Sequence, residues 1–125
     1  MTLPPETLDL LNDIVAAAND ALAEDLVAID VTERSPFSDV FLIMTADNPR
    51  HLRAVRSNLM DDVRKRTGRS PLSVEGEDDS EWLLLDYGDV VIHIFLGEAR
   101  GFYALDKLWS LNPRVDVETP MAKAS

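Results

Sequence analysis

The segment from Trp82 to Phe95 reads Trp-Leu-Leu-Leu-Asp-Tyr-Gly-Asp-Val-Val-Ile-His-Ile-Phe. Two apolar runs enclose a short polar stretch around Gly88, which predicts a β-hairpin with strands at Trp82–Tyr87 and Asp89–Phe95. Antiparallel partners keep a constant sum of residue numbers. If residues 86 and 89 flank the turn, the predicted cross-strand pairs are Leu84 with Val91 and Trp82 with His93.

Successive residues of a strand point to opposite sides of a sheet, so the hairpin has two different faces. The first face is entirely aliphatic and is expected to pack against helices: Leu83, Leu85, Val90, Ile92 and Ile94. The second face mixes apolar and charged groups: Trp82, Leu84, Asp86, Asp89, Val91, His93 and Phe95. An aromatic anchor among polar groups is typical of a protein-binding face. The alternative is that Trp82 is only a cross-strand packing residue on a half-exposed sheet.

Three further strands are expected outside the hairpin. Residues 26–31 alternate apolar and other side chains, which indicates a strand with one face more buried. Residues 40–44 are apolar at every position, which is typical of a central strand covered on both faces. A short strand is expected at residues 72–75, antiparallel to its neighbours in the chain.

Two helices are expected before residue 70. The first follows Pro4 and Pro5 and has an apolar stripe at spacings of three and four: Leu8, Leu11, Val15, Ala18 and Leu22. The second begins where Asn48 can cap a helix just before a proline, and Gly68 supplies its C-terminal stop. The basic residues of this second helix are expected to form a solvated outer face.

The order of elements predicts an α/β (α+β) fold in which a mixed sheet carries flanking helices. A short helix is expected over residues 101–109. Residues 1–112 are expected to form one domain, because the chain is near the commonest domain size. The polar residues 113–125 lack apolar periodicity and are expected to be a disordered tail.

Composition narrows the functional classes. The chain has 125 residues, a formal net charge of -11 and no cysteine, which excludes disulfides, thiol nucleophiles and thiolate metal sites. The charge disfavours electrostatic nucleic-acid binding and favours a basic protein partner. The first 25 residues carry acids without Lys or Arg, and no apolar run reaches the roughly 20 residues that cross a bilayer. A cytoplasmic protein is therefore expected.

The sequence offers little for catalysis. Four aspartates at predicted strand ends could converge in a metal or phosphoryl-transfer site, although such residues more often close turns: Asp30, Asp39, Asp86 and Asp89. The only neutral-pH bases are His51 and His93, and no Gly-rich phosphate loop occurs. We therefore expect no catalytic residue, metal or cofactor. A nucleotide- or metal-dependent transferase is the alternative.

Three stretches closely resemble the Iojap-like ribosomal silencing factors: Val74–Gly76, the hairpin Trp82–Phe95, and Arg100-Gly-Phe-Tyr-Ala-Leu-Asp-Lys-Leu-Trp109. Residues 39–45 and 48–51 resemble the family's earlier strand and helix start. The resemblance implies a fold related to the nucleotidyltransferases without their activity. The Gly-Ser and paired-aspartate motif of the active enzymes is absent before and within residues 39–44.

The resemblance also implies a partner and a role. The family binds ribosomal protein number fourteen of the large ribosomal subunit, blocks association with the small subunit, and lowers translation when nutrients are scarce. Homodimers occur in the family. In the family, the hairpin residues matching Trp82 and Tyr87 contact the ribosomal protein.

Further candidate contacts come from position and charge. Leu84 and Asp86 lie on the mixed face of the hairpin, and Tyr103 is an amphipathic residue expected near the same end. An acidic group is expected to steer the chain toward a basic ribosomal protein: Glu77, Asp78, Asp79 and Glu81.

Overall fold

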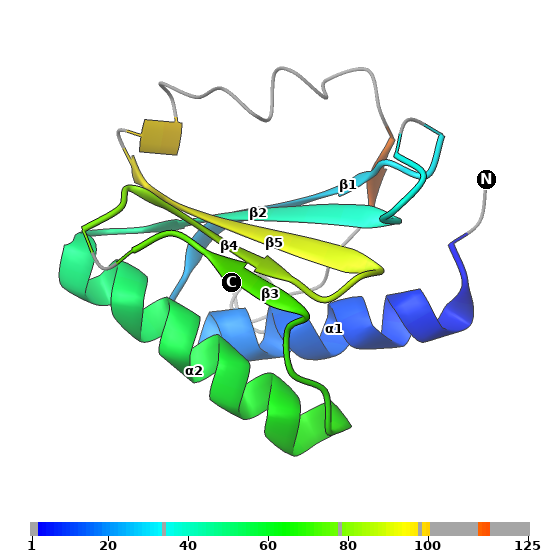
Figure 1. Ribbon diagram of the computed structural model, residues 1–125, viewed down its shortest axis with the longest axis horizontal. Coiled ribbons are helices and arrows are strands. Elements are labelled where there is room, and N and C mark those ends of the chain that lie inside the picture. The colour runs from blue at the N-terminus through cyan, green and yellow to red at the C-terminus, as the bar shows by residue number, and fades with distance from the viewer. Residues whose placement is uncertain (1–2, 34, 78, 98, 101–112, 116–125) are drawn as a thin grey trace, which may run out of the picture.

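The sheet and its two helices form two layers, with both helices on the same face of the sheet (Figure 1). The computed structural model describes residues 3–33, 35–77, 79–97, 99–100 and 113–115. In chain order the elements are α1 (Pro5–Asp20), β1 (Glu24–Asp30), β2 (Val40–Ala46), α2 (Pro49–Thr67), β3 (Ser73–Glu75), β4 (Trp82–Asp86), β5 (Val90–Leu96) and β6 (Arg114–Val115). The sheet order is β3-β4-β5-β2-β1-β6. The mixed sheet with flanking helices is confirmed.

The parallel pair of β2 and β5 forms the centre of the sheet. Its register runs from Val40 opposite Val90 to Ala46 opposite Leu96. All other neighbouring strands pair antiparallel. Parallel neighbours need a crossover connection, and here the chain crosses through α2 and the β3–β4 hairpin before β5 begins. The central strand predicted at residues 40–44 is confirmed and extends to Ala46.

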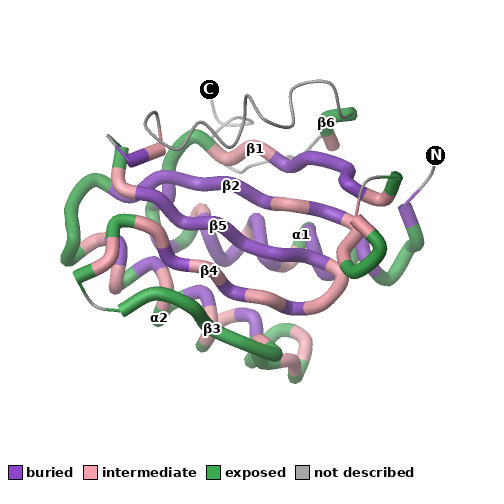
Figure 2. The backbone as a smooth tube through the Cα atoms, turned by 45° about the horizontal axis from the view of Figure 1, so that its top comes forward, coloured by how far each residue is buried: buried purple, intermediate pink, exposed green. Residues whose placement is uncertain are grey.

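The aliphatic face of the hairpin packs against the helices, as expected. Its five residues are fully buried in one cluster with side chains from both helices. The helix residues of this cluster include Leu10, Leu11, Ile14 and Val15 from α1 and Leu52, Val55, Leu59 and Val63 from α2. Exposure is low along β2 and β5 and high along β3, which lies at the outer edge (Figure 2). The hydrophobic core therefore lies between the helices and the centre of the sheet.

The register predicted for the β4–β5 hairpin is wrong by two residues. Leu84 lies opposite His93 and Trp82 lies opposite Phe95. The reason is the turn, because Tyr87 N donates to Val90 O at 2.9 Å and leaves Gly88 as the first loop residue, with φ +87°. An even shift leaves every side chain on its expected face. The two-face assignment therefore holds although the cross-strand partners change.

The second helix begins and ends where the sequence predicts. Asn48 Oδ1 accepts a hydrogen bond from His51 N at 2.8 Å, and Gly68 follows the helix with φ +78°. The first helix ends earlier than predicted. It stops at Asp20, and Leu22 leaves the stripe with φ +65° and 66% of its surface exposed. Within the described ranges, no helix combines the length and apolarity needed to cross a membrane.

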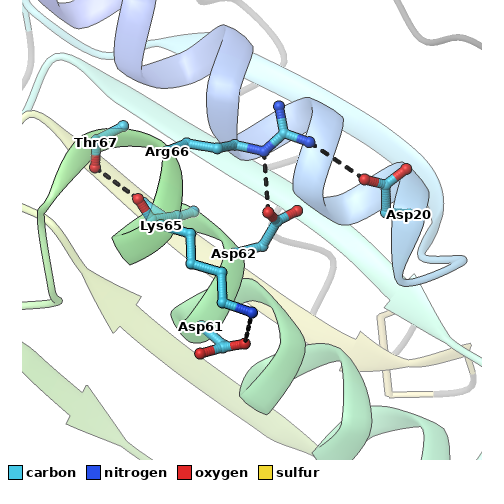
Figure 3. Close-up of polar contacts among 7 residues, drawn as sticks. Asp20, Asp61, Asp62, Lys65, Arg66 and Thr67 are labelled. Atoms are coloured by element: carbon cyan, nitrogen blue, oxygen red, sulfur yellow. Dashed lines mark hydrogen bonds and ion pairs between the residues drawn. The ribbon is translucent and has the colours of Figure 1, made fainter.

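Ion pairs occupy much of the basic face of α2 near its C-terminus (Figure 3). Arg66 reaches Asp62 at 3.1 Å on its own helix and Asp20 of α1 at 3.3 Å. Lys65 pairs with Asp61 at 3.0 Å. These groups are partly or largely solvent-exposed, so the pairs add little to the free energy of unfolding. Two of the pairs lie within α2, and the pair of Arg66 with Asp20 joins α2 to α1.

Two residues of the tail predicted at 113–125 belong to the sheet, and residues 116–125 lie outside the described residues. Arg114–Val115 form β6, which pairs antiparallel with β1, and Asp30 N donates to Pro113 O at 2.9 Å. The sequence does not reveal this strand, because two residues are too few to show a pattern of alternation. The helix expected at residues 101–109 lies outside the described residues, as do Tyr103 and Asp78.

Two glycines with positive φ provide a matched test of the fold. A Cβ on Gly76, at φ +105°, would lie 2.8 Å from Trp82 O and 2.6 Å from Leu83 Cδ2, whereas a Cβ on Gly68 would meet nothing within 4 Å. Urea unfolding of Gly76→Ala should therefore show a loss of about 2 to 4 kcal/mol from strain and crowding. Gly68→Ala should lose only about 1 kcal/mol. Equal losses would contradict the close approach of Gly76 to β4.

Candidate functional site

The row of side chains on β4 that faces away from the helices is partly accessible. Trp82, Leu84 and Asp86 are half-buried, while the alternate residues Leu83 and Leu85 are fully buried. The β5 residues on the same face are buried instead, with 7% exposure at Val91, 4% at His93 and none at Phe95. The accessible part of the mixed face is therefore narrower than the sequence suggests.

A shallow hollow of about 230 Å³ adjoins this row. It is lined by Glu75, Gly76, Trp82 and Leu84, because β3 places Glu75 opposite Leu84. We call these four residues together with Asp86 the Trp82 surface. Pockets for small ligands usually occupy roughly 300–1,000 Å³, so the size of this hollow suits a protruding side chain better than a cofactor.

The indole of Trp82 packs against two side chains of β5, His93 and Phe95. Its Nε1 donates to His93 Nδ1 at 3.2 Å, and its ring stacks on Phe95 with centroids 4.9 Å apart. His93 in turn meets the ring of Phe41 edge-on at 4.9 Å. Trp82 therefore packs against the second apolar cluster of the sheet, which includes Phe95 and Ile43, and keeps part of its surface accessible. The cross-strand packing expected for Trp82 is confirmed, and its role in binding a partner stays a prediction.

Acidic residues lie beside the Trp82 surface. Glu77, Asp79 and Glu81 are exposed on the loop from residue 77 to 81, which we call the acidic loop, and Leu96 N donates to Glu81 O at 3.0 Å. The sequence has no Lys or Arg from residue 70 to residue 99. The charged side chains of this segment are therefore all acidic, which suits a basic partner, while Arg69 lies beside Asp89 at the turn of the hairpin and Arg100 donates to Thr45 Oγ1.

Tyr87 is not accessible, contrary to the expectation of a contact residue. Its side chain is fully buried in the helix-side cluster, on the same face as Leu83 and Leu85. Burial raises the pKa of its hydroxyl, and this oxygen has no hydrogen-bond partner among the described residues. In this conformation Tyr87 supports the hairpin from the core side and cannot contact a partner. Its position two residues after Leu85 is the signal that predicts this burial.

The two histidines occupy structural positions. Burial lowers the pKa of His93 from 6.5 to about 4, which keeps the imidazole neutral at physiological pH. His51 uses both ring nitrogens at the start of α2: Nδ1 accepts from Asp47 N at 3.0 Å and Nε2 lies 3.0 Å from Ala21 O. Neither ring is arranged as an accessible general base.

The aspartates at the strand ends make local contacts. Asp30 Oδ1 accepts from both Thr32 N and Thr32 Oγ1, and Asp86 Oδ1 accepts from Gly88 N at 2.7 Å. Asp39 Oδ2 accepts from Thr7 Oγ1 at 2.9 Å. In the part of the chain that the structure describes, no three His, Asp or Glu side chains are grouped to hold a metal. These carboxylates therefore stabilise turns and the contact between α1 and the sheet.

Three further residues contribute to the Trp82 surface or contact it, and their part in it is not predicted from the sequence. Glu75 and Gly76 line the hollow, and His93 bonds the indole. The resemblance of Val74–Gly76 to a family motif is the one sequence signal for the first two. The pairing of β3 with β4, which brings them to Trp82, becomes visible only in the fold.

Comparison with known proteins identifies the family. The family model described as "Ribosomal silencing factor during starvation" matches residues 4–125. The ribosomal silencing factor RsfS of Bacillus subtilis is 34% identical over 112 residues, covering 90% of this chain and 94% of that protein. The mouse protein named mitochondrial assembly of ribosomal large subunit protein 1 is 34% identical over 106 residues, covering 83% of this chain and 45% of that protein.

A solved structure shows the same architecture. The crystal structure of a protein from Bacillus halodurans superposes with a TM-score of 0.75 at 34% identity, covering 88% of this chain and 99% of that one. The family match includes β6 and continues beyond the boundary at residue 112 that the sequence analysis expected. On these grounds the chain belongs to the RsfS family of ribosomal silencing factors.

Proposed function

We propose that this chain binds the large ribosomal subunit through ribosomal protein number fourteen and sterically prevents association with the small subunit. The Trp82 surface is the docking site in this proposal. The observation that carries it is the combination of a half-buried tryptophan, an adjoining hollow and the exposed acidic side chains of Glu77, Asp79 and Glu81. Support for the subunit comes from the family and from the mouse relative, whose name refers to assembly of the ribosomal large subunit.

The chemistry of the surface suits a ribosomal protein. Such proteins are basic because they bind RNA, and a basic partner is attracted by the acidic loop before contact. Trp82 then supplies a large contact area with little side-chain freedom left to lose, because His93 and Phe95 already hold its ring. Leu84 and the hollow receive an apolar side chain of the partner.

The mechanism requires no chemical step. A protein bound at the face where the two subunits meet excludes the small subunit for as long as it stays bound. The rate of translation then falls in proportion to the fraction of large subunits that are occupied. The family description, which names starvation, fits a role when nutrients are limiting, in the cytoplasm of the cell.

The direct test is sedimentation of the chain with separated ribosomal subunits. We expect it to travel with the large subunit alone and to reduce the formation of joined ribosomes when small subunits are added. Depletion of ribosomal protein number fourteen from the large subunit should abolish the association. Sedimentation with the small subunit, or with large subunits that lack this protein, would contradict the proposal.

Truncation of Trp82 should weaken binding more than it weakens the fold. Trp82→Ala should cost about 2 kcal/mol of binding to the large subunit, roughly thirtyfold in affinity, as for a typical interface anchor. The matched control is Phe37→Ala, because Phe37 is an aromatic residue with 87% exposure on the β1–β2 loop. It should bind with unchanged affinity. Equal losses in both variants, measured by sedimentation titration, would place the docking site elsewhere.

Tyr87→Phe separates a core role from a contact role. The substitution removes a buried hydroxyl that lacks a described partner, so stability should stay unchanged or rise by about 1 kcal/mol. Binding to the large subunit should equal that of the wild type. Urea unfolding and the same titration measure the two quantities. A clear loss of binding with intact stability would show that the hydroxyl reaches the partner.

Charge reversal in the acidic loop should act on association. The double variant Glu77→Lys, Asp79→Lys should slow association about threefold to tenfold at low salt and leave dissociation nearly unchanged. The control Asp9→Lys, Glu33→Lys makes the same change in net charge at exposed positions outside the acidic loop. Stopped-flow kinetics at several salt concentrations measure the rates. If both double variants slow association equally, net charge matters and the acidic loop does not.

A further inference from the structure

His93 occupies a position where an apolar side chain would be expected. It lies in the middle of β5 with 4% of its surface exposed, and the described side chains around it on this face are largely apolar. Its neighbour across the parallel pair is the fully buried Ile43, and its closest described ring contacts are Phe41 and Trp82. Packing alone therefore gives no reason for an imidazole here.

At physiological pH the imidazole has one cost to stability at this position. Its Nδ1 accepts the hydrogen bond from Trp82, so the neutral ring carries its proton on Nε2. This second nitrogen is buried and has no hydrogen-bond partner among the described residues. Burial also depresses the pKa of the ring to about 4, so the ring is neutral at physiological pH and this shift reduces stability only as the pH falls below 6.5. An aliphatic residue of similar size would avoid the unsatisfied nitrogen.

What the imidazole does provide is an acceptor for Trp82. The bond of 3.2 Å from Nε1 gives the indole a directional contact, whereas the stacking on Phe95 does not depend on where the indole N–H points. Because burial lowers the pKa of His93 to about 4, its Nδ1 remains an acceptor at physiological pH. The bond joins the central strand β5 directly to the accessible row on β4.

We infer that His93 is a positioning residue that holds the Trp82 indole in its docking orientation, at the expense of some fold stability. This inference rests on the proposed function, because it assigns the orientation of Trp82 a role in partner binding. A ring that is already oriented loses less freedom on binding, so loss of the acceptor should weaken binding about threefold to tenfold.

The test compares His93→Leu with His93→Gln in the full chain. Leucine removes the acceptor, whereas the amide oxygen of glutamine can replace it. The direct readout is the NMR signal of the Trp82 indole N–H in ¹⁵N-labelled protein. The chain has two tryptophans, and the signal of Trp82 is the one that disappears in Trp82→Phe. In His93→Leu this signal should move upfield and exchange faster with solvent, while His93→Gln should stay closer to the wild type.

Binding and stability are then measured on the same proteins. His93→Leu should be at least as stable as the wild type and should bind the large subunit threefold to tenfold more weakly. His93→Gln should recover most of the affinity. In a Trp82→Phe background, which lacks the donor, His93→Leu should cause no further loss of binding.

The outcomes separate this inference from the proposed function. An unchanged indole signal in His93→Leu, or an equal loss of binding with and without the Trp82 donor, would overturn the positioning role. If Trp82→Ala leaves subunit binding intact, the docking proposal fails, and the role of the indole orientation in binding fails with it. If His93→Leu does not fold, His93→Phe, which also lacks an acceptor, takes its place in the same comparisons, with the same expected results and the same contradicting results.

Discussion

The parallel pairing of β2 with β5 is the constraint on which the rest of the structure depends. Seven residue pairs, from Val40 with Val90 to Ala46 with Leu96, bring together segments that are 50 residues apart in the chain. The connection between them must run over one face of the sheet, and α2 fills this role with its stripe from Leu52 to Val63. The first helix covers the remainder of the same face. The side chains of β4 that point away from the helices stay partly accessible.

The two sides of the β4–β5 hairpin have different surroundings. The residues of β4 alternate, so Leu83 and Leu85 anchor the strand to the helices while Trp82 and Leu84 stay at its accessible face. Because β4 pairs with the central β5, the accessible row lies beside the buried centre of the sheet, and His93 of β5 accepts a hydrogen bond from the indole. Only the short edge strand β3 lies beyond β4, and it completes the hollow through Glu75.

Features governed by local chemistry could be predicted from the sequence. Asn48 and Gly68 mark the ends of α2 because capping and positive φ depend on neighbouring residues alone. The faces of the hairpin follow from alternation, and the uniformly apolar run at 40–44 predicts a central strand. The mixed face of β4, including Trp82, was identified on the same grounds.

The sequence does not predict features that depend on contacts between residues far apart in the chain, or on a choice between two similar turns. The register of the hairpin depends on which loop position Gly88 takes, and either choice fits the sequence. Leu22 continues the helical spacing, yet the chain turns away into β1 before it. The strand β6 exists only because β1 offers an edge to Arg114–Val115. Tyr87 is expected as a contact through the family resemblance alone, whereas alternation from Leu85 places it on the buried face.

The central claim is that the Trp82 surface docks on the large ribosomal subunit. Amide hydrogen exchange of the chain, alone and bound to the large subunit, tests it most directly, because it maps the covered surface without any substitution. The account predicts slowed exchange concentrated in residues 75–86, where the acidic loop and the accessible row of β4 lie, with no change along the outer face of α1 and α2. Protection of the helices with unchanged exchange in residues 75–86 would contradict it.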